Sequence, residues 1–296
     1  MAYEAEMIAD FKTRVGEGPV WDPKRQILNW TDIQTGRLFE YDPSTGKSRK
    51  IYQGEYIGGY ANNKQGGFVV ASWSGIGLWR EGEEITYIHQ GALHGMPLQF
   101  NDVTAGPGGQ FYAGTYYEDG RRAKLYMFDP DGGITIVQED IGTSNGLGFS
   151  PDLSTSYYVD TQQKRIWAYD FDAASGAFSN RRDLIVFEGE EGFPDGMTVD
   201  SEGFIWQAMW GGGCVIRIDP DGKEERRVRF PATQTSSAMF GGKDLNELYV
   251  TTAWNGTGEN SPGTYDGAAH RGGELYRVKL DVQGKAEFET DFAWPE

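Results

Sequence analysis

Carboxylate and carboxamide side chains stand at the start of several similar stretches of this sequence. Glu17, Asn101, Asn145 and Asp195 each precede an apolar, strand-like run, and no histidine or cysteine accompanies them. Oxygen-only ligands suit hard cations such as Ca²⁺, Mg²⁺ or Mn²⁺. Carboxylates that face each other in a confined space repel, and a divalent cation removes that cost. Each position alone is better explained as a turn residue, but the four equivalent positions together favour a metal site.

These stretches belong to an internal repeat that organises the whole chain. The repeats start near Glu17, Gly58, Asn101, Asn145, Asp195 and Ser236, at intervals of about 41 to 50 residues. Each start leads into an apolar run, a turn and two further apolar runs. A period of ~40–50 residues with three or four strands per unit is typical of a β-propeller blade. The sequence therefore predicts an all-β, six-bladed β-propeller that forms a single domain over residues 1–296. Its innermost strands would line a central channel, so the repeat starts would form a ring.

The rest of each repeat is consistent with this fold. Asp-Pro turns begin at Asp42, Asp129 and Asp219, and each joins two apolar runs. Aromatic residues in the runs suit the packing between blades, and the single cysteine, Cys214, is expected to be a small apolar residue in a strand. The expected inter-blade aromatic residues are Trp21, Trp30, Phe149, Trp167 and Trp206.

Composition narrows the class of protein. The net charge of −17 argues against a nucleic-acid partner, because phosphate binding needs basic clusters. One cysteine permits no intrachain disulfide. The first ten residues lack the basic and apolar regions of a signal peptide, and no apolar run approaches the ~20 residues of a membrane span, so a cytoplasmic protein without a membrane partner is expected.

Four short motifs identify a family resemblance that covers essentially the whole chain. They are Gly16-Glu17-Gly18-Pro19-Val20-Trp21, Phe100-Asn101-Asp102, Ser144-Asn145-Gly146 and Pro194-Asp195-Gly196. Together they resemble the SMP-30/gluconolactonase family, which includes regucalcin and sugar lactonases. The resemblance implies one divalent metal ion in the channel, held by Glu17, Asn145 and Asp195. It also implies that Asn101 contacts substrate or metal-bound water and that Asp195 is the catalytic general base.

The implied activity is hydrolysis of a sugar (aldono)lactone to the aldonic acid, as in gluconolactonases and xylonolactonases. A divalent ion, whether Ca, Mg, Mn, Zn or Fe(II), can polarise the lactone carbonyl and activate water. Asn101 and Asn145 could then bond the developing oxyanion or the ring hydroxyls. Some relatives carry an arginine where this chain has Gln99, which puts the exact substrate in question more than the reaction. Further substrate contacts are expected from Tyr60, Tyr116, Glu118 and Trp254.

Other functions are open at this point. One is a broad-specificity lactonase or phosphotriesterase-like propeller, and another is a non-catalytic, calcium-binding propeller. The chain could be a monomer or a weak homo-oligomer. A serine hydrolase is disfavoured, because Gly142-Thr143-Ser144-Asn145-Gly146 matches the nucleophile-elbow pattern but is followed by a strand instead of a helix. His89, His94 and His270 are too scattered to mark a triad or a zinc helix.

Overall fold

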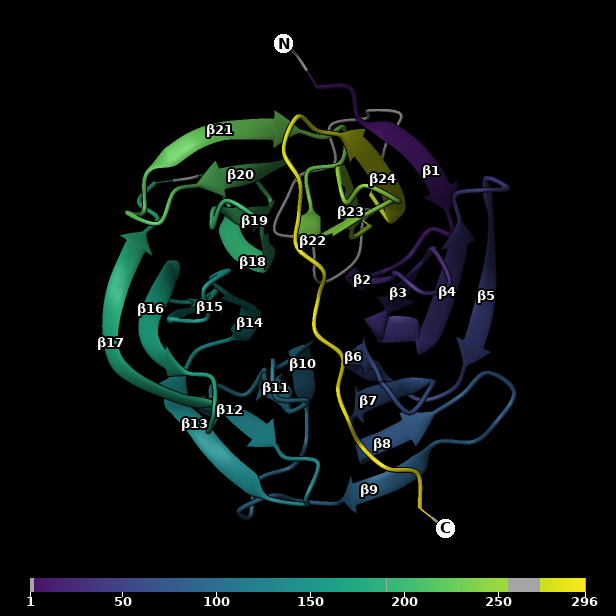
Figure 1. The fold of residues 1–296 in the computed structure, drawn as a ribbon, viewed down its shortest axis with the longest axis vertical. Helices are drawn as coiled ribbons and strands as arrows, with labels where there is room; N and C mark the ends of the chain where they lie inside the picture. Colours follow the sequence, from purple (N-terminus) through teal and green to yellow (C-terminus); the bar gives the residue numbers. More distant parts are fainter. Residues whose placement is uncertain (1–2, 190, 255–271, 296) are drawn as a thin grey trace.

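The computed structural model describes residues 3–189, 191–254 and 272–295. Its strands form six four-stranded antiparallel sheets arranged in a ring around a central axis (Figure 1). The described part contains a single short helical turn, the 3₁₀ helix Ile33–Thr35. The prediction of an all-β, six-bladed β-propeller is confirmed. No helix in these described ranges is long and apolar enough to cross a membrane.

The blades follow one another along the chain. Blade 1 contains β2 (Gly16–Asp22), β3 (Ile27–Asp32), β4 (Arg37–Asp42) and β5 (Lys47–Gln53). Blade 2 contains β6 (Ile57–Asn62), β7 (Phe68–Ser72), β8 (Gly75–Trp79) and β9 (Thr86–Gln90). Blade 3 contains β10 (Phe100–Ala105), β11 (Phe111–Thr115), β12 (Ala123–Phe128) and β13 (Ile134–Ile141). Blade 4 contains β14 (Ser144–Phe149), β15 (Thr155–Asp160), β16 (Arg165–Asp172) and β17 (Ala177–Val186). Blade 5 contains β18 (Phe193–Val199), β19 (Ile205–Trp210), β20 (Cys214–Ile218) and β21 (Glu224–Arg229). Blade 6 contains β22 (Thr235–Gly241), β23 (Glu247–Thr252), β24 (Glu274–Lys279) and β1 (Glu6–Asp10).

The outermost strand of each blade is the one that the repeat pattern does not reveal. Strands β3, β7 and β11 are buried along their whole length, whereas β5 and β21 are largely exposed. An outer strand has one side in solvent and carries charged residues, so it lacks the apolar run that marks the inner three. Each of the first five repeats therefore contributes a fourth strand that its apolar pattern does not show.

The ring is closed by pairing the two ends of the chain in one blade. Strand β1 pairs antiparallel with β24, with Glu6 opposite Arg277 and Asp10 opposite Glu274. The first strand of the chain is thus the outer strand of blade 6, beside strands from the last repeat (Figure 1). The repeat analysis did not assign this strand, because its partner lies far away in the sequence.

Residues 280–295, the C-terminal strap, run across one end of the propeller axis (Figure 1). The strap forms β-bridges from Gly284 to Asp200 and from Thr290 to Asn63, which belong to blades on opposite sides of the ring. Asn63 Nδ2 also donates to the backbone oxygen of Phe292, at 2.9 Å. These partners follow the ends of inner strands, so the strap covers the end of the channel where the inner strands finish.

Aromatic residues fill the spaces between neighbouring blades, as expected. Trp21 of blade 1 stacks on Tyr249 of blade 6, with centroids 5.9 Å apart, and Trp206 meets Phe240 edge-on at 5.6 Å. All five of the predicted inter-blade aromatics are buried, and so is Cys214 in β20. The Asp-Pro segments form tight turns, with Gly132 N donating to Asp129 O and Gly222 N to Asp219 O. His270 lies outside the described residues.

Candidate functional site

Every innermost strand is irregular at the place where its ring residue lies. The pairing register shifts between Glu17 and Val20 in β2, and comparable shifts occur at the starts of β6, β10, β14, β18 and β22. Bulges of this kind re-aim side chains and are frequent beside active sites. In β2 the bulge includes Gly18, whose φ of +50° favours glycine. The structure therefore brings the six repeat starts to one level of the channel, as predicted.

Glu17 and Asp195 are buried carboxylates at this level, with only 7% and 6% of their surface exposed. Burial raises the pKa of Glu17 well above its usual value, and repulsion from Asp195 and Asp102 raises it further. The pKa of Asp195 is also raised, first by burial and then by Asp102. Among the described residues, no lysine, arginine or histidine offsets these effects. The described residues thus provide no cationic partner for Glu17 and Asp195.

The carboxamides of Asn145 and Asn101 are oriented by a hydrogen-bond chain between blades 3, 4 and 5. Asn145 Nδ2 donates to Thr161 Oγ1 at 2.7 Å, and Thr161 Oγ1 donates to the backbone oxygen of Pro194 at 2.7 Å. Asn101 Nδ2 donates to Asn145 Oδ1 at 3.0 Å and to Ser144 O at 2.8 Å. Both hydrogens of the Asn101 amide are therefore engaged. Asn101 cannot also donate to an oxyanion in this arrangement, but its Oδ1 can accept a hydrogen bond from a hydroxyl.

The other two ring positions hold the blades together. Ser236 is fully buried, and its Oγ donates to the backbone oxygen of Gly16 at 2.5 Å. A side chain at Gly58 would collide with the backbone oxygen of Phe100, so glycine permits blades 2 and 3 to approach closely. These two positions maintain the ring geometry and leave the oxygen ligands to the other four.

The donors present fit a divalent cation. Glu17 and Asp195 supply two anionic oxygens in a buried place, and the Asn145 amide oxygen is aimed by the bond from its nitrogen to Thr161. Within residues 3–189, 191–254 and 272–295, no three His, Cys, Asp or Glu side chains form a metal-binding group. The predicted ligand set, two carboxylates and the neutral carboxamide of Asn145, is compatible with this finding.

A pocket of about 690 Å³ opens at the end of the channel where the inner strands begin. Asn101, Gln99, Tyr116 and Glu118 line it, as expected for substrate contacts. The backbone N–H of Tyr116 donates to Gln99 O at 2.9 Å, which holds these two residues together. The pocket is also lined by Tyr56 and Trp73 of blade 2, together with Arg14, Val15, Ile33, Gln34, Asp119 and Arg121.

Two expected substrate contacts lie elsewhere. Tyr60 is buried below the ring, next to Gly18, where its hydroxyl has no hydrogen-bond partner among the described residues. Tyr60 lies three residues beyond the start of β6. It is therefore deeper in the channel than the ring and lines a different cavity. Trp254 is exposed and is held by backbone bonds to Thr13 and Arg14, outside the set of pocket-lining residues. The substrate contacts of Tyr60 and Trp254 stay predictions, with Trp254 bonded to Arg14 of the pocket wall.

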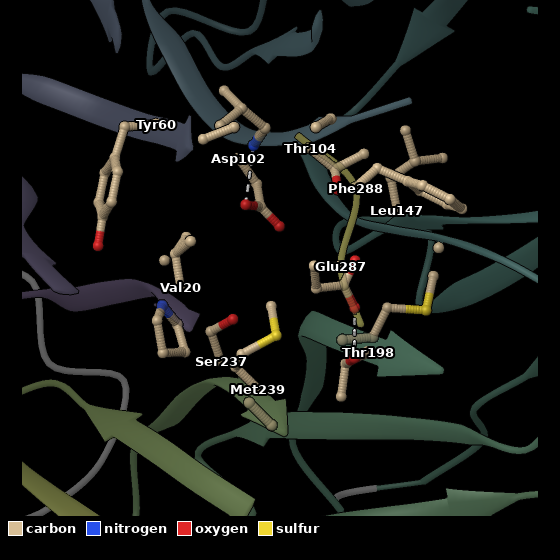
Figure 2. Close-up of a pocket in the computed structure, with 18 of the residues that line it drawn as sticks. Val20, Tyr60, Asp102, Thr104, Leu147, Thr198, Ser237, Met239, Glu287 and Phe288 are labelled. Carbon is tan, nitrogen blue, oxygen red and sulfur yellow. Dashed lines mark hydrogen bonds between the residues drawn. The ribbon is translucent and has the colours of Figure 1, made fainter. Parts of the chain in front are cut away.

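The cavity that contains Tyr60 is a small space of about 50 Å³ on the other side of the ring. Figure 2 shows Asp102, Ser237 and Glu287 around it, with Thr198 Oγ1 donating to Glu287 Oε1 at 3.0 Å. Glu287 comes from the C-terminal strap. Burial raises the pKa of Asp102 to about 6, even though Val103 N donates to its carboxylate at 2.8 Å. Asp102 and Glu287 are acidic groups of the channel that sequence reasoning missed.

The structure leaves no nucleophile elbow at Ser144. Ser144 lies within the innermost strand β14, and its Oγ accepts a 2.6 Å hydrogen bond from Tyr158. Its side chain is fully buried. A nucleophile elbow needs a helix after the serine, whereas here the chain continues as strand β14, as the sequence analysis expects.

Comparisons with known proteins place the chain in a family. Residues 15–254 match the family model described as SMP-30/Gluconolactonase/LRE-like region. Pentonolactonase XacC from Haloferax volcanii is 37% identical, with 96% of this chain and 97% of the relative covered. Regucalcin from Xenopus laevis is 35% identical, with coverages of 95% and 96%.

Solved structures show the same relationship. A luciferin-regenerating enzyme superposes with a TM-score of 0.88 at 30% identity, covering 98% of this chain and all of that one. The calcium-binding protein regucalcin from Agrobacterium tumefaciens gives a TM-score of 0.87 at 26% identity, with 99% of both chains covered. The chain therefore belongs to the SMP-30/gluconolactonase/LRE-like family.

Proposed function

We propose that this protein hydrolyses a sugar (aldono)lactone to the aldonic acid, using one divalent cation held by Glu17, Asn145 and Asp195. The observation that carries the proposal is the pair of buried carboxylates, Glu17 and Asp195, which no described lysine, arginine or histidine neutralises. They lie at the level of Asn101, which lines the 690 Å³ pocket. Such a pair is costly unless a cation joins it.

When bound, the cation supplies Lewis acidity for the lactone carbonyl and lowers the pKa of water. Asp195 then accepts the proton of the attacking water, which is the role of a general base. The Asn145 amide stays fixed by Thr161, so its oxygen can ligate without rearrangement. Glu17 contributes charge and ligation only. Its Oε2 already accepts from the backbone N–H of Gly18 at 3.0 Å, which fixes the carboxylate.

The substrate would be placed by the polar side chains of the pocket. Asn101 Oδ1 is available to accept from a substrate hydroxyl, since the amide nitrogen is fully engaged. Gln99 and Glu118 add an amide and a carboxylate to the same wall. These groups suit a polyhydroxylated ring. The names of relatives, pentonolactonase and 6-deoxy-6-sulfogluconolactonase, support five- and six-carbon sugar lactones as the substrate class.

The proposal is tested with a panel of five- and six-membered aldonolactones, each assayed with Ca²⁺, Mg²⁺, Mn²⁺, Zn²⁺ and Fe²⁺. Acid release is followed against the spontaneous hydrolysis of each lactone. At least one aldonolactone should be hydrolysed with a kcat/KM in the enzymatic range, roughly 10⁴ M⁻¹s⁻¹ or more. Background rates for every lactone with every metal would contradict the proposed reaction. Better hydrolysis of phosphotriesters than of any lactone would move the assignment to the phosphotriesterase-like alternative.

A further inference from the structure

Trp73 is the most exposed large apolar side chain among the described residues, at 49%. It follows strand β7 and lines the pocket that contains Gln99 and Asn101. An exposed tryptophan on the outer surface of a propeller would need no explanation. One that opens into the polar pocket next to the ring of oxygen ligands suggests a role in ligand binding.

The loop that presents Trp73 is firmly held. Ser72, which is fully buried, accepts hydrogen bonds at its Oγ from the backbone N–H groups of Ser74 and Gly75, at 3.1 and 3.2 Å. Gly91 N donates to Ser74 O at 3.1 Å and ties the loop to the next connection. The indole is therefore exposed on a rigid support, which lowers the entropy lost when it contacts a ligand.

Tyr56 fixes the indole from behind. The two rings stack with centroids 4.1 Å apart and an interplanar angle of 28°. Burial raises the pKa of Tyr56, the interaction with Trp73 opposes this shift, and the carboxylates of Glu17 and Glu118 add to it. The Tyr56 hydroxyl thus stays protonated at neutral pH and lies within electrostatic reach of both the ring and the opposite pocket wall. Tyr56 covers one face of the Trp73 ring, and 49% of the Trp73 side chain remains exposed.

The charged groups that line the pocket cannot by themselves bind a neutral lactone, which leaves a role for an apolar contact. Gln99 carries no charge, Arg121 is paired with Asp119 at 2.7 Å, and Arg14 and Glu118 are the other charged side chains of the wall. A neutral lactone forms no ion pair with these groups, so its affinity must come from hydrogen bonds and from apolar contact. A sugar ring has a C–H face that packs against an aromatic ring, because the electron-rich face of the indole attracts the polarised hydrogens.

We propose that Trp73 is a stacking platform for the C–H face of the lactone ring and a specificity-determining residue of the pocket, with Tyr56 as its positioning residue. The inference rests on the proposed lactonase function and adds the chemical feature of the substrate that the pocket selects. It favours cyclic lactones with one face free of axial hydroxyls, such as D-glucono-1,5-lactone and D-xylono-1,5-lactone. The open-chain aldonate product has no such face, so the platform also discriminates substrate from product.

The test compares Trp73→Ala and Trp73→Phe with Ile88→Ala, using D-glucono-1,5-lactone and D-xylono-1,5-lactone. Ile88 is a matched control, because it is an exposed apolar residue of the same blade and lies outside the pocket. Trp73→Ala should lose roughly tenfold or more in kcat/KM, mainly through a higher KM. Trp73→Phe should retain most of the wild-type value, and Ile88→Ala should retain all of it. Circular dichroism and melting curves confirm that each variant is folded.

A binding measurement separates this inference from the proposed reaction. D-glucono-1,5-lactam, which resists hydrolysis, is titrated into metal-loaded wild-type protein and Trp73→Phe while tryptophan fluorescence is recorded. The wild-type emission should change on binding, and the change should disappear in Trp73→Phe. An unchanged KM in Trp73→Ala, or a lactam response that survives in Trp73→Phe, overturns the platform. A wild-type protein that hydrolyses no lactone but gives the Trp73-dependent lactam signal contradicts the reaction and supports the platform.

Discussion

The carboxylates of Glu17, Asp102 and Asp195 lie close together near the propeller axis. Their arrangement suits catalysis but lowers the stability of the folded protein when they are ionised. Burial raises the pKa of all three, and mutual repulsion adds to the effect at Glu17 and Asp195. A divalent cation at the ring would offset the charge of Glu17 and Asp195 directly. Asp102 lines the small cavity below the ring, so it is the group best suited to measuring the electrostatic cost separately from ligation.

We predict that Asp102→Asn stabilises the metal-free protein at pH 7.5 and has little effect near pH 4. The pKa of Asp102 rises from 3.8 to about 6 on folding, so its carboxyl binds the proton more tightly in the folded state. Its stabilising contribution is complete below pH 3.8 and is lost as the pH rises through about 6. Asparagine keeps the carbonyl oxygen that accepts from Val103 N.

The gain in the free energy of unfolding should reach at most about 3 kcal/mol at pH 7.5. It is measured by urea denaturation in the presence of a chelator, at pH 4 and pH 7.5. Asp244→Asn serves as the control, since Asp244 is exposed. An Asp102→Asn variant that is less stable than wild type at pH 7.5 would show that the carboxylate is stabilised by its surroundings.

Gln99→Ala is predicted to change selectivity among lactones more than it changes turnover. Gln99 lines the pocket beside Asn101 and lies outside the ring of ligands. Loss of one hydrogen bond should raise KM roughly three- to tenfold for the lactones whose hydroxyls it contacts. Steady-state kinetics on several lactones would show this, with Gln65→Ala at the strap end as the control. A uniform loss on every lactone, as large as that of a ligand variant, would speak against a selectivity role.

At the residue scale, the sequence is sufficient to predict the residues of the ring but not every side chain that faces the channel. Glu17, Asn101, Asn145 and Asp195 were found because they recur at one place in the repeat. Asp102 could not be found in this way. Neighbouring residues of a regular strand point to opposite faces, so Asp102 is expected to point away from the channel if Asn101 points into it. The bulge between Phe100 and Val103 turns both Asn101 and Asp102 towards the channel, and bulges have no clear sequence signature here.

At the scale of elements, the inner and outer strands differ in how visible they are in the sequence. Inner strands carry apolar runs and were located, whereas β5 and β21 are rich in lysine, arginine and glutamate. The C-terminal strap is likewise invisible to the repeat pattern, since it contacts ends of several blades instead of forming a strand. It covers the end of the channel opposite the pocket. The strap should therefore affect stability far more than catalysis.

We predict that Phe292→Ala destabilises the protein by roughly 3–5 kcal/mol, the usual cost of removing a buried phenylalanine. Phe292 is buried with residues of blades 2 and 3, and its backbone bonds to Asn63. The kcat/KM of the folded enzyme should stay within about twofold of wild type, because the substitution lies far from the pocket. Trp294→Ala, a change at a partly buried strap residue, should cost less. A large loss of activity in a folded Phe292→Ala variant would mean that the strap influences the pocket.

At the scale of the whole molecule, closure of the ring depends on pairing between distant parts of the chain. The period of the repeats was enough to predict six blades, because each blade is a local unit. The contribution of β1 to blade 6 could not be predicted from the period, since it joins residues near position 8 to residues near position 276. We predict that residues 1–296 unfold as one domain, in a single transition.

Deletion of residues 1–10 should lower Tm by roughly 5–10 °C and promote self-association. The deletion leaves β24 as an unpaired edge and removes the ion pair of Glu6 with Arg277. Calorimetry and light scattering would measure both effects, with Met7→Ala, an exposed change that preserves the strand, as the control. A melting curve unchanged by the deletion would show that β1 does not close the ring. Two separate transitions in the intact protein would contradict a single domain.

The central claim is that the axial carboxylates hold a divalent ion that lactone hydrolysis requires. It is tested most directly by removing metal with a chelator and titrating metal back into wild type, Glu17→Gln and Asp195→Asn. Stripped wild type should be inactive and should recover at one ion per chain, and Glu17→Gln should recover partly with excess metal. Asp195→Asn should stay at least ~10²-fold below wild type even at saturation, since its base is missing. Full lactonase activity in the stripped wild type, or full recovery of Asp195→Asn with metal, would contradict the account.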